Sequence, residues 1–235
     1  MKLNKTKIVA TLGPASTSRL MLKKLLNAGV DVFRINFSHA SYVEITETVK
    51  NIRELSAELH IHASVLGDLQ GPKIRLGLVK ENTFVKKGDV IEITTTVVSG
   101  GDEKRVSINY SDFACDVNVD EKILVNDGKL IFKILETNKK DLVRAQVIQG
   151  GVLESRKGVN LPNTKISLPA LTKKDKEDAL FAIKNEFDWI ALSFVRSKKD
   201  IAILQKLISS KSSYKIPIIA KIEKPEAITN MDEII

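Results

Sequence analysis

The sequence predicts an α/β protein whose parallel sheet is interrupted by an all-β domain. Residues 1–70 alternate between short β-branched runs and helical periods of apolar residues, in the order strand, helix, strand, helix, strand. That alternation is typical of parallel βα units. The same rhythm returns in residues 168–235, whereas residues 71–167 hold short β-branched segments separated by Gly-containing turns. We therefore expect an α/β domain in two parts, 1–70 and 168–235, with 71–167 inserted between them.

The elements of the first part follow from local patterns. "KIVATLG", "VDVFRINFS" and "ASVLGD" are short β-branched runs and predict three strands. Apolar residues recur at helical spacing between these runs, and Gly29 suits the end of the first helix. The helical positions are Leu22, Leu25 and Leu26 in the first helix, and Ile45, Val49, Ile52, Leu55 and Leu59 in the second.

Turn signals organise the insertion, and helical periods organise the last part. Gly100-Gly101 and Asp127-Gly128 both indicate hairpins within the insertion. After "NLPNTKISLPALT" we expect a helix through Ala179, Ile183 and Phe187, the strand "DWIALSFVR", a second helix and the strand "KIPIIAKIE". The second helix is indicated by Ile203, Leu204, Leu207 and Ile208. The sheet would then hold five parallel strands.

Net charge, aromatic content, apolar run length and cysteine count argue against several classes of protein. The net charge of +8 over 235 residues is spread along the chain, and aromatic residues make up 5%, a pattern that argues against a nucleic-acid-binding surface. No apolar run reaches the length of a membrane-spanning helix, so we expect no membrane partner. With Cys115 as the one cysteine, no internal disulfide can form. These features predict a cytoplasmic protein.

Polar side chains follow the predicted strands at the point where each one ends. Residues two apart on a strand point the same way, so Arg34, Asn36 and Ser38 share one face. Because ligands of parallel α/β proteins bind at the carboxyl ends of the strands, we expect these side chains to line one pocket. The other members, each near the end of its own strand, are Asp68, Ser193, Arg196, Lys221 and Glu223.

This mixture of side chains favours phosphate chemistry. Arg34 and Lys221 can hold an anion, the first as a planar fork and the second as a point charge. Glu223 offers the hard oxygen ligand that Mg²⁺ takes sparingly beside substrate oxygens and water. The sequence has no Gly-rich phosphate-binding motif, so side chains and a metal would have to hold the phosphate. Phosphoryl transfer asks mainly for such positioning and charge neutralisation.

Several blocks of sequence together resemble the pyruvate kinase family. They are "TKIVATLGPAS", "VFRINFSH", "GDLQGPKIR", "VNDGKL", "KGVNLP", "ALSFVR" and "IAKIEKPEAI", in this order. The resemblance implies a (β/α)8 TIM barrel, of which about five strands are present, interrupted by an all-β, barrel-like lid domain. It also implies transfer of the phosphoryl group of phosphoenolpyruvate to ADP in glycolysis, giving pyruvate and ATP, with Mg²⁺ as cofactor and a homotetrameric full-length protein.

The resemblance also implies roles for particular residues. Lys221 resembles the lysine that stabilises charge on the transferring phosphoryl group, Glu223 a Mg²⁺ ligand, and Arg34 the arginine that contacts the substrate phosphate. Ser193 and Phe194 lie in the block that flanks the substrate site, and the lid would carry Asp127 near its closing edge. The positions that match nucleotide contacts are Asn36, Phe37, Ser38, His39, Arg75 and Lys157.

A monovalent cation is a further feature of the family that this sequence modifies. In much of the family K⁺ is bound by oxygens that match Asn36, Ser38, Asp68 and a threonine after the aspartate. Here the residue after the aspartate is Leu69, and Lys73 stands where K⁺-dependent members carry a glutamate. A lysine ammonium can supply the charge that K⁺ would bring. We therefore expect an enzyme that does not require K⁺.

The family's second metal carboxylate and a substrate-binding threonine find no match among the residues of this sequence. We therefore expect an N-terminal fragment, with residues 168–235 as a truncated continuation of the barrel, that is inactive alone. Two alternatives remain open at this stage. One is a Mg²⁺-dependent lyase or aldolase of the wider phosphoenolpyruvate/pyruvate barrel group, and the other is a non-catalytic truncated copy that serves as a binding module.

Overall fold

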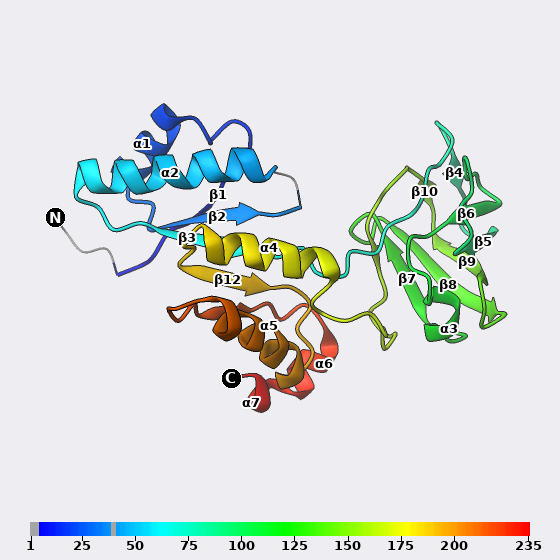
Figure 1. The fold of residues 1–235 in the computed structure, drawn as a ribbon. Helices are drawn as coiled ribbons and strands as arrows, with labels where there is room; N and C mark the ends of the chain where they lie inside the picture. Colours follow the sequence, from blue (N-terminus) through cyan, green and yellow to red (C-terminus); the bar gives the residue numbers. More distant parts are fainter. Residues whose placement is uncertain (1–4, 39–40) are drawn as a thin grey trace. The chain divides into compact units, whose positions relative to one another are not determined.

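The chain forms two compact units in a computed structural model that describes residues 5–38 and 41–235. The first unit comprises Met1–Pro72 and Pro169–Ile235, and the second comprises Lys73–Leu168 (Figure 1). Each unit has its own hydrophobic core. Within the described ranges, no helix combines the length and apolarity that crossing a membrane requires.

The first unit is built on a five-stranded sheet in the order β1-β2-β3-β12-β13, and every neighbouring pair is parallel. The five parallel strands expected from the sequence are confirmed. Their bounds are β1 Val9–Thr11, β2 Val32–Asn36, β3 Ser64–Asp68, β12 Trp189–Leu192 and β13 Ile218–Ala220. The helices are α1 Arg19–Asn27, α2 Tyr42–Leu59, α4 Lys173–Lys184, α5 Lys198–Lys211, α6 Pro225–Thr229 and α7 Met231–Ile234.

Helices and strands of this unit meet in one core. Leu22 and Leu26 of α1, and Ile52 and Leu55 of α2, are almost fully buried, as their helical spacing predicts. Figure 1 shows α2, α4 and α5 running beside the strands. One expected boundary was wrong, because α4 ends at Lys184 and Phe187 lies beyond it. That side chain is nevertheless fully buried in the same core.

Strand β2 shows how the core sets the direction of the polar side chains. Burial alternates along it, with Phe33, Ile35 and Phe37 buried and the residues between them half-buried. Because successive side chains of a strand point to opposite faces, the apolar face fixes the other one. Arg34 and Asn36 therefore share the polar face, as predicted.

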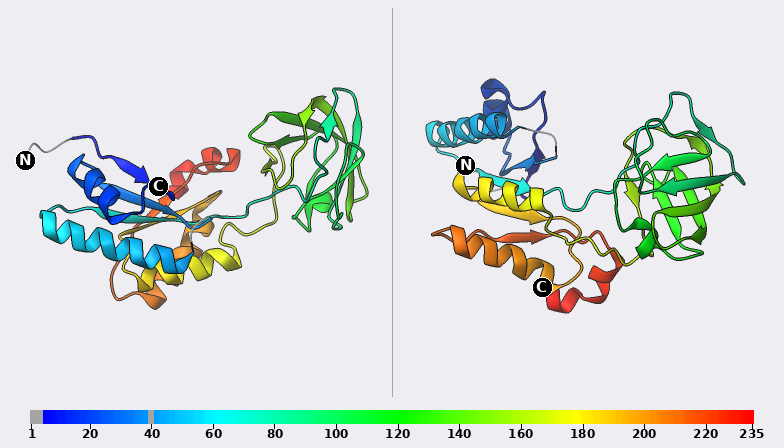
Figure 2. Two further views of the ribbon diagram at one scale, coloured as in Figure 1. Left: turned by 90° about the horizontal axis from the view of Figure 1, so that it is seen from above. Right: turned by 45° about the vertical axis from the view of Figure 1, so that its right-hand side comes forward.

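The second unit is a β structure around a separate core (Figure 2). A six-stranded sheet has the order β11-β7-β8-β9-β5-β6, and β10 pairs with β4. A four-residue helix, α3, covers Phe113–Asp116. The strands are β4 Phe84–Val85, β5 Val90–Thr94, β6 Arg105–Ser107, β7 Lys122–Val125, β8 Leu130–Thr137, β9 Leu142–Gln149, β10 Gly151–Val152 and β11 Val159–Asn160.

One of the two predicted hairpins is correct. Asp127 and Gly128 both have positive φ, 56° and 83°, and join the antiparallel strands β7 and β8, as a two-residue hairpin turn requires. The prediction at Gly100-Gly101 was wrong, because β5 and β6 pair in parallel. Gly101 instead forms a bridge with Val79, and a Cβ there would lie 2.9 Å from the carbonyl oxygen of Arg105. Gly101 thus serves a close backbone approach.

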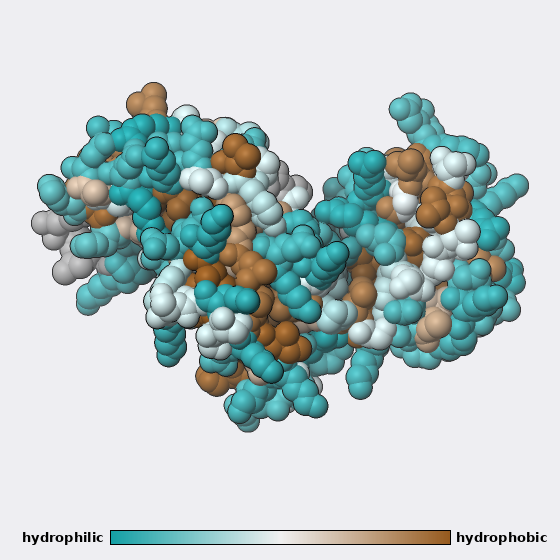
Figure 3. Space-filling model, in the orientation of Figure 1, coloured by the Kyte–Doolittle hydropathy of each residue, from teal (hydrophilic) through white to brown (hydrophobic). Residues whose placement is uncertain are grey.

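The surface agrees with the high content of charged residues. The face shown in Figure 3 is mostly hydrophilic, with smaller hydrophobic areas on both units. Leu20, Val43 and Ile228 are among the large apolar side chains that are exposed.

Gly71 allows the chain that leaves β3 to pass close to the chain that leaves β12. It has a φ of 68°, and its amide donates a hydrogen bond to the buried carboxylate of Asp175 over 3.0 Å. A Cβ at this position would lie 2.8 Å from the ring of Phe194 and 2.9 Å from the Cβ of Ser193. Glycine is required here both by the backbone conformation and by the space.

We expect Gly71→Ala to destabilise the first unit by about 1–3 kcal/mol, because the new methyl group must displace packed neighbours at a strained φ. Trp189 is the one tryptophan and lies in β12, so its fluorescence during urea unfolding reports on this unit. Gly13→Ala is the matched control, since no atom beyond the two adjoining residues lies within 4 Å of the added carbon. Equal midpoints for the two variants would contradict the packing argument.

Tyr110 is a buried polar group in the second unit. Its hydroxyl contacts the carboxylate of Asp116 and lies 3.1 Å from the Oγ of Ser167, whose amide also donates to Asp116 over 2.7 Å. Burial and the hydrogen bond to Asp116 raise the pKa of Tyr110 to about 12. The neutral phenol is therefore the form that the folded unit favours.

Because the folded pKa lies above the ordinary value of about 10, the stabilisation from Tyr110 is complete below pH 10 and is lost as pH rises toward 12. We expect Tyr110→Phe to be less stable than the parent at pH 8, with the difference shrinking between pH 10 and 12. Urea unfolding followed by far-UV circular dichroism measures this. A difference that stays constant over that range would contradict the prediction.

Candidate functional site

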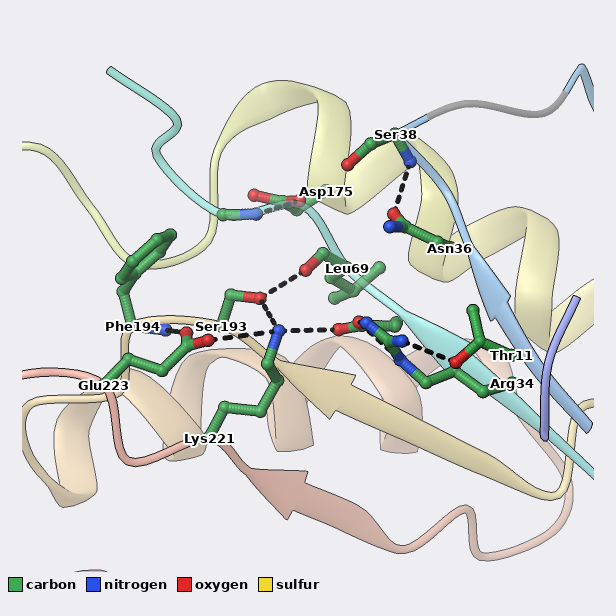
Figure 4. Close-up of polar contacts among 12 residues, drawn as sticks. Thr11, Arg34, Asn36, Ser38, Leu69, Asp175, Ser193, Phe194, Lys221 and Glu223 are labelled. Carbon is green, nitrogen blue, oxygen red and sulfur yellow. Dashed lines mark hydrogen bonds and ion pairs between the residues drawn. The ribbon is translucent and has the colours of Figure 1, made fainter. Parts of the chain in front are cut away.

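A polar cluster that includes Arg34, Ser193 and Lys221 lies at the carboxyl ends of the strands (Figure 4). Its centre is Asp68, the last residue of β3. Its side chain is buried and accepts hydrogen bonds from the Nε of Arg34 over 2.8 Å and from the Nζ of Lys221 over 3.0 Å. Arg34 comes from β2, and Lys221 directly follows β13. One carboxylate therefore links the ends of three strands.

Lys221 is held by several acceptors at once. Besides Asp68, its Nζ donates to the Oγ of Ser193 over 2.8 Å and lies 3.4 Å from Oε1 of Glu223. The Oγ of Ser193 in turn donates to the carbonyl oxygen of Leu69 over 2.6 Å. These partners come from the ends of β3, β12 and β13, so the ammonium group has a defined position at the edge of the sheet.

Glu223 is oriented through both of its oxygens. Oε1 faces Lys221, and Oε2 accepts a hydrogen bond from the backbone N–H of Phe194 over 3.0 Å. Phe194 has a φ of 55°, a conformation that side-chain-bearing residues adopt at some cost. That conformation lets the amide donate to the carboxylate. Burial also lowers the pKa of the adjacent Lys224.

Glu223 fits the role of a Mg²⁺ ligand better than Asp68 does. The side chain of Glu223 is 35% exposed, whereas Asp68 is buried between two cations. Across residues 5–38 and 41–235, no three His, Cys, Asp or Glu side chains gather into a metal site. Mg²⁺ commonly takes only one or two carboxylates, with water and substrate oxygens as its other ligands. The donor set is thus compatible with that cation.

A cavity lies beside the polar cluster within the first unit. Its volume is about 460 Å³, and Thr11 and Asn36 contribute to its wall. Thr11 ends β1 and accepts a hydrogen bond from the Nη1 of Arg34 over 2.7 Å. The other lining residues are Leu12, Gly13, Pro14, Thr17, Ile35, Glu44, Ile45 and Thr48. The space is large enough for a small organic ligand.

Sequence reasoning missed two of the residues that organise this edge. Thr11 follows from the same end-of-strand argument applied to the first strand. Asp175 was hidden inside a helical pattern, where it caps α4 through the amide and hydroxyl of Thr172 and also accepts from the amide of Gly71. A Thr-x-x-Asp pattern at a helix start was the available signal.

The structure brings some of the predicted site residues together and places others apart from them. Arg34, Asp68, Ser193, Lys221 and Glu223 come together, and Asn36 accepts from the amide of Ser38 over 2.9 Å. Arg196 pairs with Asp200 at the start of α5. His39 lies outside the described residues. The residues that belong to the second unit are Lys73, Arg75, Asp127 and Lys157.

Within the second unit these residues have local partners. Arg75 donates to the carbonyl oxygen of Arg156 over 3.0 Å, and Lys157 lies 3.3 Å from Glu154. The carbonyl oxygen of Lys73 accepts from the side chain of Asn109. Their predicted roles toward a nucleotide or a cation stay predictions.

Comparisons with known proteins identify relatives of this chain. The chain is 40% identical over 232 residues to a pyruvate kinase of Corynebacterium glutamicum, covering 98% of this chain and 48% of that protein. It is 42% identical to a probable cytosolic pyruvate kinase isozyme of Arabidopsis thaliana, covering 98% and 47%. A crystal structure of a pyruvate kinase from Cryptosporidium parvum matches with a TM-score of 0.91 at 34% identity, covering 98% of this chain and 48% of that one.

The chain spans about half the length of the curated relatives it matches. A family model described as "Pyruvate kinase, barrel domain" matches residues 3–235, which is nearly the whole sequence. The parallel sheet with its polar strand ends, and the similarity over both units, have one explanation: the chain belongs to the pyruvate kinase family.

Proposed function

We propose that the protein containing this chain transfers the phosphoryl group of phosphoenolpyruvate to ADP. The observation that carries the proposal is the convergence of Arg34 from β2 with Lys221 and Glu223 after β13 (Figure 4), with Asp68 of β3 between the two cations. Relatives at about 40% identity are named pyruvate kinases. The alternatives, a lyase or aldolase and a non-catalytic copy, are not favoured by these names.

The residues divide the work as the reaction requires. Arg34 and Lys221 would bind the anionic phosphoryl group, and Lys221 would stabilise the charge that develops as the bond to the enol oxygen breaks. The phosphorus gains a bond to an oxygen of the ADP β-phosphate, and the released enolate takes a proton on carbon to become pyruvate. Mg²⁺, with Glu223 as one ligand, would neutralise phosphate charge. Ser193 keeps the ammonium in place.

The nucleotide would bind next to the phosphoryl group. Asn36 lines the cavity of about 460 Å³, which supports its predicted role, together with Ser38, at the nucleotide. The ring of Phe37 is buried in the core, its amide donates to the carbonyl oxygen of Asp68 and its carbonyl oxygen accepts from Lys174, so its predicted nucleotide contact has no support from these contacts. A cytoplasmic location is supported by the relative named a cytosolic isozyme. Homotetramer formation by the intact protein stays a prediction.

K⁺ independence is the second part of the proposal. The side chain of Leu69 is fully buried in the core and offers no oxygen, and its carbonyl oxygen is already bound by Ser193. A cation beside the phosphoryl group would therefore lack one of the ligands expected in K⁺-dependent relatives. Lys73 remains the predicted source of the missing charge.

We expect Lys221→Met in the intact protein to lower kcat by about 100- to 1,000-fold, the usual effect of removing one preorganised donor to developing charge. Pyruvate formation from phosphoenolpyruvate and ADP is measured at saturating substrates. Lys215→Met is the matched control, because that lysine is exposed in the loop before β13. Retention of full activity by the Lys221 variant would refute its role.

We expect the intact protein to change its rate less than about twofold when KCl is added to a tetramethylammonium buffer, since Lys73 supplies a fixed charge. Lys73→Glu should become K⁺-activated, because the fixed charge is replaced by a carboxylate that attracts a cation. Strong activation of the unmodified protein by KCl would refute K⁺ independence.

A further inference from the structure

Helix α4 holds the chain on both sides of the connection between β2 and α2. The Nζ of Lys174 donates a hydrogen bond to the carbonyl oxygen of Phe37 over 3.1 Å. One turn later, Oδ1 of Asp178 accepts a hydrogen bond from the hydroxyl of Tyr42, the first residue of α2, over 2.7 Å. Two residues of one helix thus attach the end of a strand and the start of the next helix.

The two attachments form one unit because Lys174 and Asp178 are paired. The Nζ of Lys174 lies 2.6 Å from Oδ2 of Asp178, whose side chain is completely buried. A buried carboxylate is costly unless both oxygens find partners. Burial and the hydrogen bond to Asp178 raise the pKa of Tyr42, so its hydroxyl remains a proton donor at neutral pH.

Aromatic contacts place the same segments independently of the charges. The rings of Tyr42 and Phe181 stack at 4.3 Å between centroids with an angle of 10°. Phe181 also meets the ring of Phe37 edge-on at 6.1 Å, and Phe37 stacks on Phe187 at 5.9 Å. These contacts can hold the rings in position. The polar contacts then have a separate task, which is to fix the orientation of the backbone.

The orientation of one peptide group connects Lys174 to the side chain of Asn36. The carbonyl of Phe37 and the N–H of Ser38 belong to the same planar peptide unit, so turning one turns the other. Lys174 binds the carbonyl oxygen, and the N–H donates to Oδ1 of Asn36 over 2.9 Å. Asn36 contributes to the wall of the cavity described above.

We propose that Lys174, held by Asp178 and Tyr42, is a positioning residue that sets the orientation of Asn36 through the Phe37–Ser38 peptide and thereby raises the affinity for the nucleoside diphosphate. This inference rests on the proposed function. Lys174 itself touches neither substrate nor metal in this scheme. We expect its effect on the nucleotide, because Lys174 binds Phe37 and Asp178, whereas the carboxylate of Asp68 binds Arg34 and Lys221.

The test is steady-state kinetics of the intact protein with Lys174→Met. We expect the KM for ADP to rise about three- to tenfold, the effect of losing one or two hydrogen bonds. The KM for phosphoenolpyruvate and kcat should change less than twofold. Lys176→Met, an exposed lysine on the same helix, is the matched control and should behave like the parent. Equal rises in both KM values, or no rise for ADP, would overturn the inference.

A double variant tests the inference if Lys174→Met alone is too unstable to fold. Lys174→Met with Asp178→Asn removes both charges and leaves no unpaired buried carboxylate, so it should fold if the single variant does not. It should show the same selective rise in the KM for ADP. Lys174→Arg, which keeps the cationic donor, should recover most of the ADP affinity.

Titration of ADP by calorimetry, without phosphoenolpyruvate, distinguishes failure of the proposed function from failure of the positioning role of Lys174. If the parent protein neither binds ADP nor forms pyruvate, the proposed function fails. If the parent binds ADP and Lys174→Met binds it equally well, only the positioning role of Lys174 fails.

Discussion

The site depends on one buried carboxylate that lies between two cations. Asp68 ends β3 inside the first unit, and it binds Arg34 of β2 and Lys221 after β13. Removing either cation would leave charge in a poorly solvated place, so the three side chains form a mutually dependent set. Because the ion pairs join the ends of β2, β3 and β13, they fix the positions of these strand ends relative to one another. Together with Glu223, which lies 3.4 Å from Lys221, the cluster holds two cations and two carboxylates.

Helix α4 carries two carboxylates, Asp175 and Asp178, that contact the chain near the ends of neighbouring strands. Asp175 binds the amide of Gly71, which follows β3. Asp178 binds the hydroxyl of Tyr42 at the start of α2 and pairs with Lys174, which binds the carbonyl oxygen of Phe37 after β2. Both carboxylates are fully buried and fully paired. A helix stiffened by packing and by a capping box thus controls two adjacent strand ends. Precise positioning of a few polar groups on rigid elements is the main demand of phosphoryl transfer.

Membership of the pyruvate kinase family is the basis for the phosphoryl-transfer role proposed for these side chains. The chain spans about half the length of its curated relatives, and the strand ends described here carry two cations, Arg34 and Lys221, and the carboxylate of Glu223, to which we assign the proposed phosphate and Mg²⁺ roles. Phe194 adopts an unfavourable backbone conformation in which its amide donates to Glu223, and Gly71 provides the space for the Phe194 ring. Local strain is therefore concentrated next to the group that would meet the metal.

Much of this architecture could be predicted from sequence, because it depends on local patterns. Alternating apolar residues placed Arg34 and Asn36 on one face of β2. The Asp127-Gly128 dipeptide predicted the hairpin between β7 and β8, where both residues adopt positive φ. Tertiary structure alone decided which helix residues reach the site. Gly71 and Asp175 are 104 positions apart, and Tyr42 and Asp178 are 136 apart, so no local period reveals either pair. It also decided that β5 and β6 run in parallel despite the Gly100-Gly101 signal, because strand direction follows from the packing of the whole sheet.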